Sequence, residues 1–481
     1  MSYKLDKKII NNFVFQSLFQ LVAILVPVIT TPHLCRTIGA AGIGDYSYTY
    51  TVGTYFAMFC LLGMNTYGNR ECAYVRDDKK KLSRVFWEVY GVQLLTSTLA
   101  VLAFLIFVVF FAKRCQDFLW LQTIYIIGCA LDVTWLFYGL EDFGKIVFRN
   151  ILVKIAVMTA ILTLVRTPDD TWLYVLIMSL SILASQLVLW PFVRQEIVIV
   201  KPEWPAVKSR IWPALRVSGP QLCYYVYIGI NKLLVAHMIG MDAVAYLSNA
   251  EGMSRLPAGV VTALAAVLLP RVSNLYAKGE YQREHPLVRG GIQITMAIAL
   301  PCAFGLSAIA ESMVPWYYGE EFLVCGTMIH VMAFLILFVA WGEVLQSQYL
   351  VPTHQDKVLL EASVMGIAVS MLSNLVLIYF YGVEGAGYAI LITEGTMVAY
   401  KTWCSRRGIS FWKMLKEVVP FIVAAIIMYI VVSYLGRHMA GATPMITIKQ
   451  ILVGGCVYAA CAGMGLLIKN RKRAVGGRKA G

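Results

Sequence analysis

A row of charged, polar and small residues runs through the apolar segment at residues 243–268. Its members recur at a spacing that places them on one face of a helix: Ser248, Glu251, Gly252, Arg255, Gly259 and Thr262. A charge at the centre of a membrane helix costs about 2.5–3.5 kcal/mol on insertion scales, so each needs a reason to be there. Glu251 and Arg255 can pair across one helical turn. The row predicts either an ion pair that fixes packing or, as we favour, one wall of a hydrated cavity.

Shorter polar rows mark other apolar segments. The first predicted helix carries Gln16 and Gln20 one turn apart, and a later helix carries Gln221 and Lys232, eleven residues apart and on one face. Hydrogen bonds between helices would explain any single row. Because several rows occur in one chain, we expect their helices to line a common aqueous space.

Acidic side chains inside apolar segments are candidates for carrying a coupling ion. Asp132, Glu343 and Glu394 lie within predicted helices, as does Glu251. Burial favours the neutral form of a carboxyl group, so these four are our candidate proton carriers.

Nucleotide and metal chemistry are not indicated by any motif. The segment GLEDFGKI at 139–146 has Ile where a phosphate-binding loop needs Ser or Thr. The segment GAAGIG at 39–44 reverses the dinucleotide-binding spacing, and no βαβ unit surrounds it. The histidines lack ligand spacing and the eleven cysteines include no CxxC pair. We expect no metal, no cofactor and no disulfide framework.

The elements that position these residues are membrane helices. The 481 residues are 59% hydrophobic and only 14% charged, where a soluble domain has about 25% charged residues. Fourteen apolar segments are long enough to cross a hydrocarbon core about 30 Å thick: 9–33, 45–68, 85–111, 118–139, 147–166, 171–193, 214–236, 243–268, 290–312, 323–349, 358–380, 386–404, 419–436 and 450–468. The chain is predicted to be an all-α, multi-pass membrane protein.

The net charge of +14 reflects membrane topology and not nucleic-acid binding. With a cytoplasmic N-terminus, 32 Lys and Arg residues fall on the cytoplasmic side and 6 on the other. This asymmetry follows the positive-inside rule and predicts that both termini lie in the cytoplasm. The basic tail at 469–481 is then an anchor at an anionic leaflet.

A polar stretch with three prolines, residues 194–216, divides the helices into two groups. A short repeat supports the division: TIGAAGIGDY at 37–46 and MIGMDAVAY at 238–246 both place Ile-Gly after one helix and Tyr in the next. We predict two pseudo-symmetric six-helix lobes, 1–200 and 201–410, followed by a helix pair and basic tail, 411–481. No hydrophilic stretch is long enough for a soluble domain.

Two long motifs resemble one known family. TPHLCRTIGAAGIGDYSYTYTVGTYFAMFCLLGMNTYGNRECA at 31–73 is similar to the opening hairpin of bacterial polysaccharide repeat-unit flippases, and DVTWLFYGLEDFGKIVFRN at 132–150 is similar to a second region of that family. The C-terminal half matches mainly by its pattern of helices, and His33 departs from the commoner Tyr. The resemblance implies the MATE-like fold of the multidrug/oligosaccharidyl-lipid/polysaccharide (MOP) exporter superfamily.

The resemblance also implies a transporter of undecaprenyl-pyrophosphate-linked oligosaccharide in the bacterial cytoplasmic (inner) membrane, working by alternating access of two lobes. Such a cargo suits cationic side chains, and Arg forks match phosphate oxygens. We therefore expect a pyrophosphate to meet Arg255 and Lys232, with Arg36 and Arg70 at the mouths of the cavity. Sugar hydroxyls would meet amide side chains: Gln16, Gln20 and Gln221. Further expected partners are other polysaccharide-assembly proteins, such as a polymerase or a chain-length regulator.

Two other functions stay open from the sequence. A MATE-like drug or cation antiporter shares the fold, but it would favour acidic cavity residues over Lys232 and Arg255. A membrane polymerase of the same glycan would be an enzyme, and it usually needs a large external loop that this chain lacks. We favour the flippase and expect no catalytic residues.

Overall fold

The computed structural model describes residues 7–259, 286–406, 408–439 and 441–477, with single residues 261, 272 and 276. Every regular element within these ranges is a helix, and they contain no strand. Contacts divide the chain into two compact units, Met1–Ala245 and Tyr246–Gly481. The helix α10 (Met241–Arg255) begins in the first unit and ends in the second.

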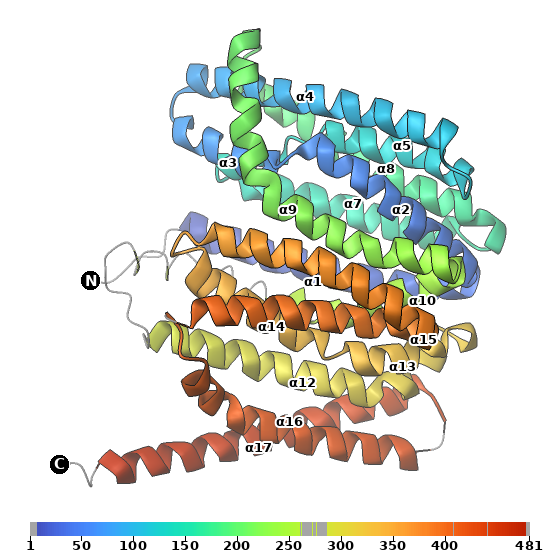
Figure 1. The fold of residues 1–481 in the computed structure, drawn as a ribbon, viewed down its shortest axis with the longest axis vertical. Helices are drawn as coiled ribbons and strands as arrows, with labels where there is room; N and C mark the ends of the chain where they lie inside the picture. Colours follow the sequence, from blue (N-terminus) through green and yellow to red (C-terminus); the bar gives the residue numbers. More distant parts are fainter. Residues whose placement is uncertain are drawn as a thin grey trace. The chain divides into compact units, whose positions relative to one another are not determined.

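The first unit is a bundle of helices in which α4, α5 and α8 lie side by side (Figure 1). Its helix α9 packs against α2, α3 and α4, so by contact it belongs to this unit. The elements before α10 are α1 (Lys7–Thr37), α2 (Gly39–Leu61), α3 (Met64–Val75), α4 (Lys79–Phe110), α5 (Gln116–Ala130), α6 (Thr134–Gly139), α7 (Phe143–Leu164), η1 (Pro168–Asp170), α8 (Thr171–Glu196) and α9 (Trp204–Met238).

The second unit ends in a pair of long helices, α16 and α17, which pack along each other and against α12 (Figure 1). The helix α15 contains two predicted spans and bends between them at Gly382, where φ is 59°. The elements after α10 are α12 (Pro286–Tyr317), η2 (Glu320–Phe322), α13 (Val324–Met332), α14 (Leu335–Leu345), η3 (Gln346–Leu350), α15 (Asp356–Ser405), α16 (Phe411–His438) and α17 (Pro444–Gly477).

Nine helical segments among the described residues are long and apolar enough to cross a membrane. They cover ten of the fourteen predicted spans, because the segment Asp356–Ser405 contains two of them. The other four predictions correspond to α1, α2, α9 and α10, although the span predicted at 243–268 continues past the described end of α10. The predicted all-helical membrane architecture is confirmed.

Both Ile-Gly pairs of the sequence repeat form turns between helices. Gly39 has a φ of 65° between α1 and α2, and Gly240 has a φ of 149° between α9 and α10. Glycine adopts these positive angles without the penalty that a Cβ atom brings. The first glycine cluster also permits close packing, since a Cβ atom on Gly44 would overlap the backbone carbonyl of Met241.

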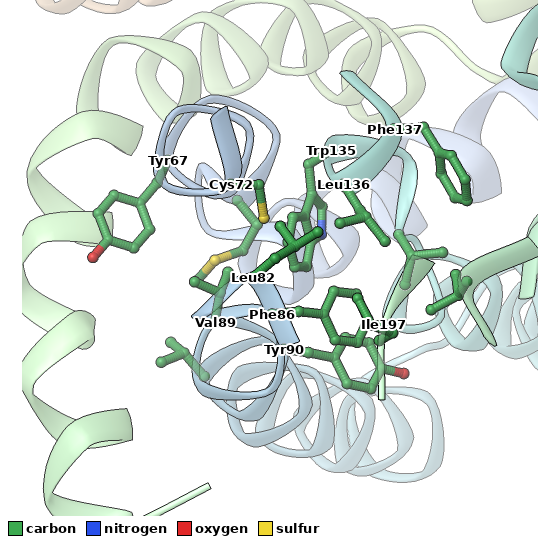
Figure 2. Close-up of a cluster of buried hydrophobic side chains, with 14 of the residues drawn as sticks. Tyr67, Cys72, Leu82, Phe86, Val89, Tyr90, Trp135, Leu136, Phe137 and Ile197 are labelled. Atoms are coloured by element: carbon green, nitrogen blue, oxygen red, sulfur yellow. The ribbon is translucent and has the colours of Figure 1, made fainter. Parts of the chain in front are cut away.

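The two motifs that carried the family resemblance pack against each other in the core of the first unit. Trp135 of α6 is fully buried, and its ring stacks on Phe86 of α4 at a centroid distance of 5.3 Å (Figure 2). Gly68 of α3 leaves room for that indole, and Gly139 of α6 lies against the backbone of Asn69. The segments 31–73 and 132–150 are thus joined by one apolar cluster.

A network of charges ties α9 to α3 and α4. Arg210 donates to Glu88 Oε2 at 2.7 Å and to Glu71 Oε2 at 2.9 Å, and its Nη1 is 3.3 Å from the Tyr67 hydroxyl. Arg84 also donates to Glu88, at 3.1 Å. Burial alone would lower the pKa of Arg210, but hydrogen bonds with Glu88 and Tyr67 outweigh it and raise that pKa. The network therefore fixes a permanently charged Arg210 among three helices.

We expect Gly44→Ala to destabilise the first unit. The added methyl group meets backbone and not a movable side chain, and overpacking of this kind costs about 1–3 kcal/mol or more. The measurement is the thermal midpoint of the detergent-solubilised protein. Gly252→Ala is the matched control, because nothing lies within 4 Å of a Cβ atom there. Equal midpoints for the two variants would contradict the packing described here.

We also expect Arg210→Met to lower the free energy of unfolding by about 3–5 kcal/mol, because it leaves Glu71 and Glu88 without their shared cation. Exposed Lys208 of the same helix provides the control Lys208→Met. Adding Glu71→Gln and Glu88→Gln to Arg210→Met should restore part of the loss. Unfolding would be followed by denaturant titration in micelles. An Arg210→Met protein as stable as the control would contradict a stabilising role of the Arg210 network.

Candidate functional site

The predicted pair of Glu251 and Arg255 exists in the second unit and has a third member. Arg255 Nε donates to Glu251 Oε1 at 2.9 Å, which confirms the pairing across one turn of α10. Arg255 Nη2 donates to Glu394 Oε1 of α15 at 3.2 Å. The two glutamate side chains are buried, whereas 24% of the Arg255 side chain is exposed. A partly accessible guanidinium thus lies between two buried carboxylates from different helices.

The formal charge of this triad is negative when all three groups are ionised. Lys401, seven residues after Glu394 on α15, interacts electrostatically with Glu394 and with Glu343 of α14. The second unit thus gathers three of the four predicted ion-coupling acids around two cations. Among the described residues, these carboxylates and cations form one electrostatic group, so the protonation of one member affects the others.

The polar row at residues 248–262 does not lie on one continuous helix within the part of the chain that the structure describes. The helix α10 ends at Arg255, and Leu256 and Pro257 form a turn. Proline has no N–H group to continue the helix and disfavours helical geometry in the residue before it. The prediction of an unbroken row was therefore wrong at Pro257, and Thr262 lies outside the described residues. The break leaves Arg255 at a helix C-terminus, where a cation is favoured.

Two predicted cavity-mouth residues contact neighbours on their own helices. Arg36 is exposed and its Nη1 donates to the carbonyl of Pro32 at 3.3 Å. Arg70 is half-exposed, with Nη2 3.7 Å from Glu71 Oε1, and it lies 5.7 Å from the centroid of the Tyr67 ring. In these contacts each arginine meets residues within four positions of its own on the same helix. The proposal that Arg36 and Arg70 bind the cargo therefore rests on their charge.

The remaining predicted binding residues of the first unit lie on α1 and α9. Gln20 is half-buried on α1, and the side chain of Gln16 lies outside the described residues. Lys232 is half-buried on α9. Gln221 of α9 lines a cavity of the first unit.

Asp132 has a structural task in the first unit. Its Oδ1 accepts from the backbone N–H of Thr134 at 2.8 Å, which caps the start of α6. Its backbone carbonyl accepts from Gln93 Nε2 at 2.8 Å. The Arg149 guanidinium interacts with it electrostatically. Asp132 therefore stabilises the local fold, independently of any role in ion coupling.

Three cations of these networks were missed in the sequence: Arg149, Arg210 and Lys401. Arg149 is buried on α7, and it donates to Asn150 Oδ1 at 2.7 Å and to Gln186 Oε1 at 3.3 Å. Arg149 and Arg210 lie near the ends of predicted spans, where a basic residue is usually interpreted as a topology signal and not as part of a site. Lys401 had a usable signal, since it lies one helical repeat of seven residues after Glu394.

Comparisons with known proteins agree with this architecture. A "Putative O-antigen transporter" of Shigella dysenteriae is 22% identical over 391 residues, which cover 78% of this chain and 94% of that protein. A lipid II flippase MurJ in an inward closed conformation gives a TM-score of 0.72 at 14% identity, over 95% of this chain and 98% of its own. An inward-facing MATE family transporter of the MOP superfamily gives a TM-score of 0.62, also at 14% identity, over 81% and 94%.

The structural matches confirm the predicted MATE-like fold, and the family resemblance is confirmed as well. The family model described as "Polysaccharide biosynthesis protein" matches residues 9–276, which is more than half of the chain. The chain belongs to the polysaccharide biosynthesis protein family.

Proposed function

We propose that this protein is a flippase that moves an undecaprenyl-pyrophosphate-linked oligosaccharide from the cytoplasmic to the outer leaflet. Family membership and the transporter names of its relatives support a polysaccharide precursor as cargo. The observation that carries the proposal is Arg255, a partly accessible guanidinium held by two buried carboxylates inside a membrane-helix unit. An ionisable cluster in such a place is expensive, so it indicates a transport pathway.

The chemistry of the cargo matches an exchangeable arginine. A pyrophosphate offers several anionic oxygens, and a guanidinium binds two of them with parallel hydrogen bonds. Phosphate oxygens that reach Arg255 would replace one of its carboxylate partners. A carboxylate that loses its cation in a low-dielectric site favours the protonated form. Cargo binding at Arg255 would thus be linked to proton uptake at Glu251 or Glu394.

Alternating access follows from the proposed organisation in two lobes, 1–200 and 201–410, with 411–481 as an accessory helix pair and tail. In this scheme Lys232, Arg36 and Arg70 attract the pyrophosphate on its way, and Asp132 and Glu343 are secondary proton carriers. The charge asymmetry of the loops supports cytoplasmic termini in a bacterial inner membrane. A polymerase and a chain-length regulator are proposed partners, because a flipped repeat unit must be joined to others.

One observation favours a MATE-like cation or drug antiporter instead. The Glu251–Arg255–Glu394 triad holds more negative than positive charge, and an acidic site suits a cationic substrate. A drug-susceptibility assay of cells that express the protein separates the two functions. The antiporter predicts resistance that is lost in Glu394→Gln, whereas the flippase predicts no resistance and restored surface polysaccharide in a flippase-deficient strain.

We expect Arg255→Gln to reduce flipping of the lipid-linked oligosaccharide in proteoliposomes at least about tenfold, which corresponds to about 1.4 kcal/mol. Arg255→Lys should retain part of the activity, because it keeps the charge but not the planar fork. Lys357→Gln is the control, since this side chain is 86% exposed. Polysaccharide export that stays intact in Arg255→Glu would rule out our assignment of Arg255.

We expect flipping by the wild type to accelerate when the side from which the cargo is taken is the more acidic, because cargo binding at Arg255 is linked to proton uptake at Glu251 or Glu394. The double variant Glu251→Gln/Glu394→Gln should lose this dependence, because neither site can then bind and release a proton. Glu384→Gln, at a half-buried position of α15 where the carboxylate accepts from Thr327 Oγ1, should retain it. The test imposes pH gradients and sodium gradients separately on proteoliposomes. Flipping that ignores both gradients and tolerates the double variant would eliminate proton coupling.

A further inference from the structure

We infer that a cavity between α2, α3, α5 and α9 is a saccharide subsite of the first unit, which recognises a sugar of the cargo. This inference rests on the proposed function and deepens it. The cavity has a volume of about 100 Å³ and an open mouth, so it is smaller than a complete small-molecule site and can receive only part of the cargo. Its polar and aromatic lining comprises Tyr50, Thr54, Asn65, Tyr125, Ser218, Gln221 and Tyr225.

The cavity lies beside a break in a membrane helix. The helix α2 ends at Leu61 and α3 begins at Met64, and both residues between them have left-handed backbones, Leu62 with φ 35° and Gly63 with φ 70°. A leucine rarely adopts such a conformation, because its Cβ atom approaches the following carbonyl oxygen. Strain of this kind is typical of binding sites, and interrupted membrane helices commonly form substrate sites.

The neighbouring helix α9 holds the break in place. A Cβ atom on Gly63 would lie 2.7 Å from the Cβ atom of Ser218, so the two helices approach closely at this point. Gln221 lies three residues after Ser218 and therefore on the same side of α9. The close approach thus fixes the Gln221 amide at the wall of the cavity.

An unpaired polar atom indicates that the cavity receives a hydrogen-bonding ligand. Asn65 Oδ1 is buried and has no hydrogen-bond partner among the residues that the structure describes. A buried acceptor without a partner is unfavourable, and it becomes favourable when a ligand donates to it. Asn65 and Gln221 together offer acceptors and donors of the kind that sugar hydroxyls require.

The rest of the lining selects among ligand classes. Tyr50 and Tyr125 lie with their ring centroids 5.2 Å apart, and Tyr225 adds a third ring. Aromatic rings with an apolar body and a polar tip suit a pyranose, which has apolar C–H faces and a polar rim. None of the lining residues is charged, so neither a phosphate nor a cation is the expected occupant. The hydroxyls and amides disfavour a polyprenyl tail.

The test compares binding of two kinds of lipid to the full chain in nanodiscs. The probes are bare undecaprenyl pyrophosphate and undecaprenyl pyrophosphate that carries one glucose, galactose or N-acetylglucosamine residue. We expect the wild type to bind at least one sugar lipid about tenfold more tightly than the bare lipid. Gln221→Leu and Asn65→Leu should each reduce this advantage to about twofold or less and leave binding of the bare lipid unchanged.

Controls separate this inference from folding and from the proposed function. Gln195→Leu, at an exposed position of α8, should keep the full advantage, and thermal midpoints verify that both cavity variants fold. Equal binding of bare and sugar lipids by the wild type would overturn the saccharide subsite alone. An advantage that survives in both cavity variants would overturn it as well. A wild type that binds none of the lipids would overturn the proposed cargo, and the subsite with it.

Discussion

An ionised side chain inside a helical membrane unit is stable only when opposite charges and hydrogen bonds replace the water that it has lost. Both units of this protein meet that constraint in the same way, with an arginine between two glutamates. Arg210 lies between Glu71 and Glu88, and Arg255 lies between Glu251 and Glu394. Each arrangement joins helices that are far apart in the sequence, so the charges determine which helices must lie together.

Charge balance distinguishes the two clusters. Around Arg210, Glu88 also pairs with Arg84, Glu71 lies near Arg70 and Arg84 lies near Glu203, so three arginines meet three glutamates. The Tyr67 hydroxyl adds another hydrogen-bond partner. Because positive and negative charges are equal in number in this network, it needs no further ion, and it holds α3, α4 and α9 together. In the second unit, by contrast, the described residues place Arg255 and Lys401 with three carboxylates: Glu251, Glu343 and Glu394. A cluster of this kind could exchange a carboxylate for an anionic ligand when a proton enters, and this is why we propose a transport role for Arg255 and a packing role for Arg210.

The sequence predicted what depends on neighbours along the chain. The apolar spans, the Ile-Gly turns and the pairing of Glu251 with Arg255 all follow from periodicity or from spacing within one helix, and the structure confirms them. It could not predict that Glu394 would be the second partner, because 139 residues separate it from Arg255. Pro257 in the sequence indicates a turn, but the apolar residues on both sides of it favour a continuous helix, and the prediction followed the apolar pattern. Gln221 was selected for its spacing from Lys232, whereas the structure places it beside a break at Leu62 that no periodic pattern indicates.

The motifs that identified the family have a physical meaning that differs from cargo recognition. Gly68 and Gly139 are small because Trp135 and the backbone of Asn69 occupy the space beside them, and Trp135 is fixed by its hydrogen bond to Gln93 at 3.0 Å. Residues with these tasks specify how α3, α4 and α6 pack, so proteins with different cargoes can share them. Specificity must then come from side chains that packing does not occupy. In the first unit Asn65 Oδ1, which has no hydrogen-bond partner among the described residues, meets that condition, so Asn65 is a position where we expect relatives with different glycans to differ.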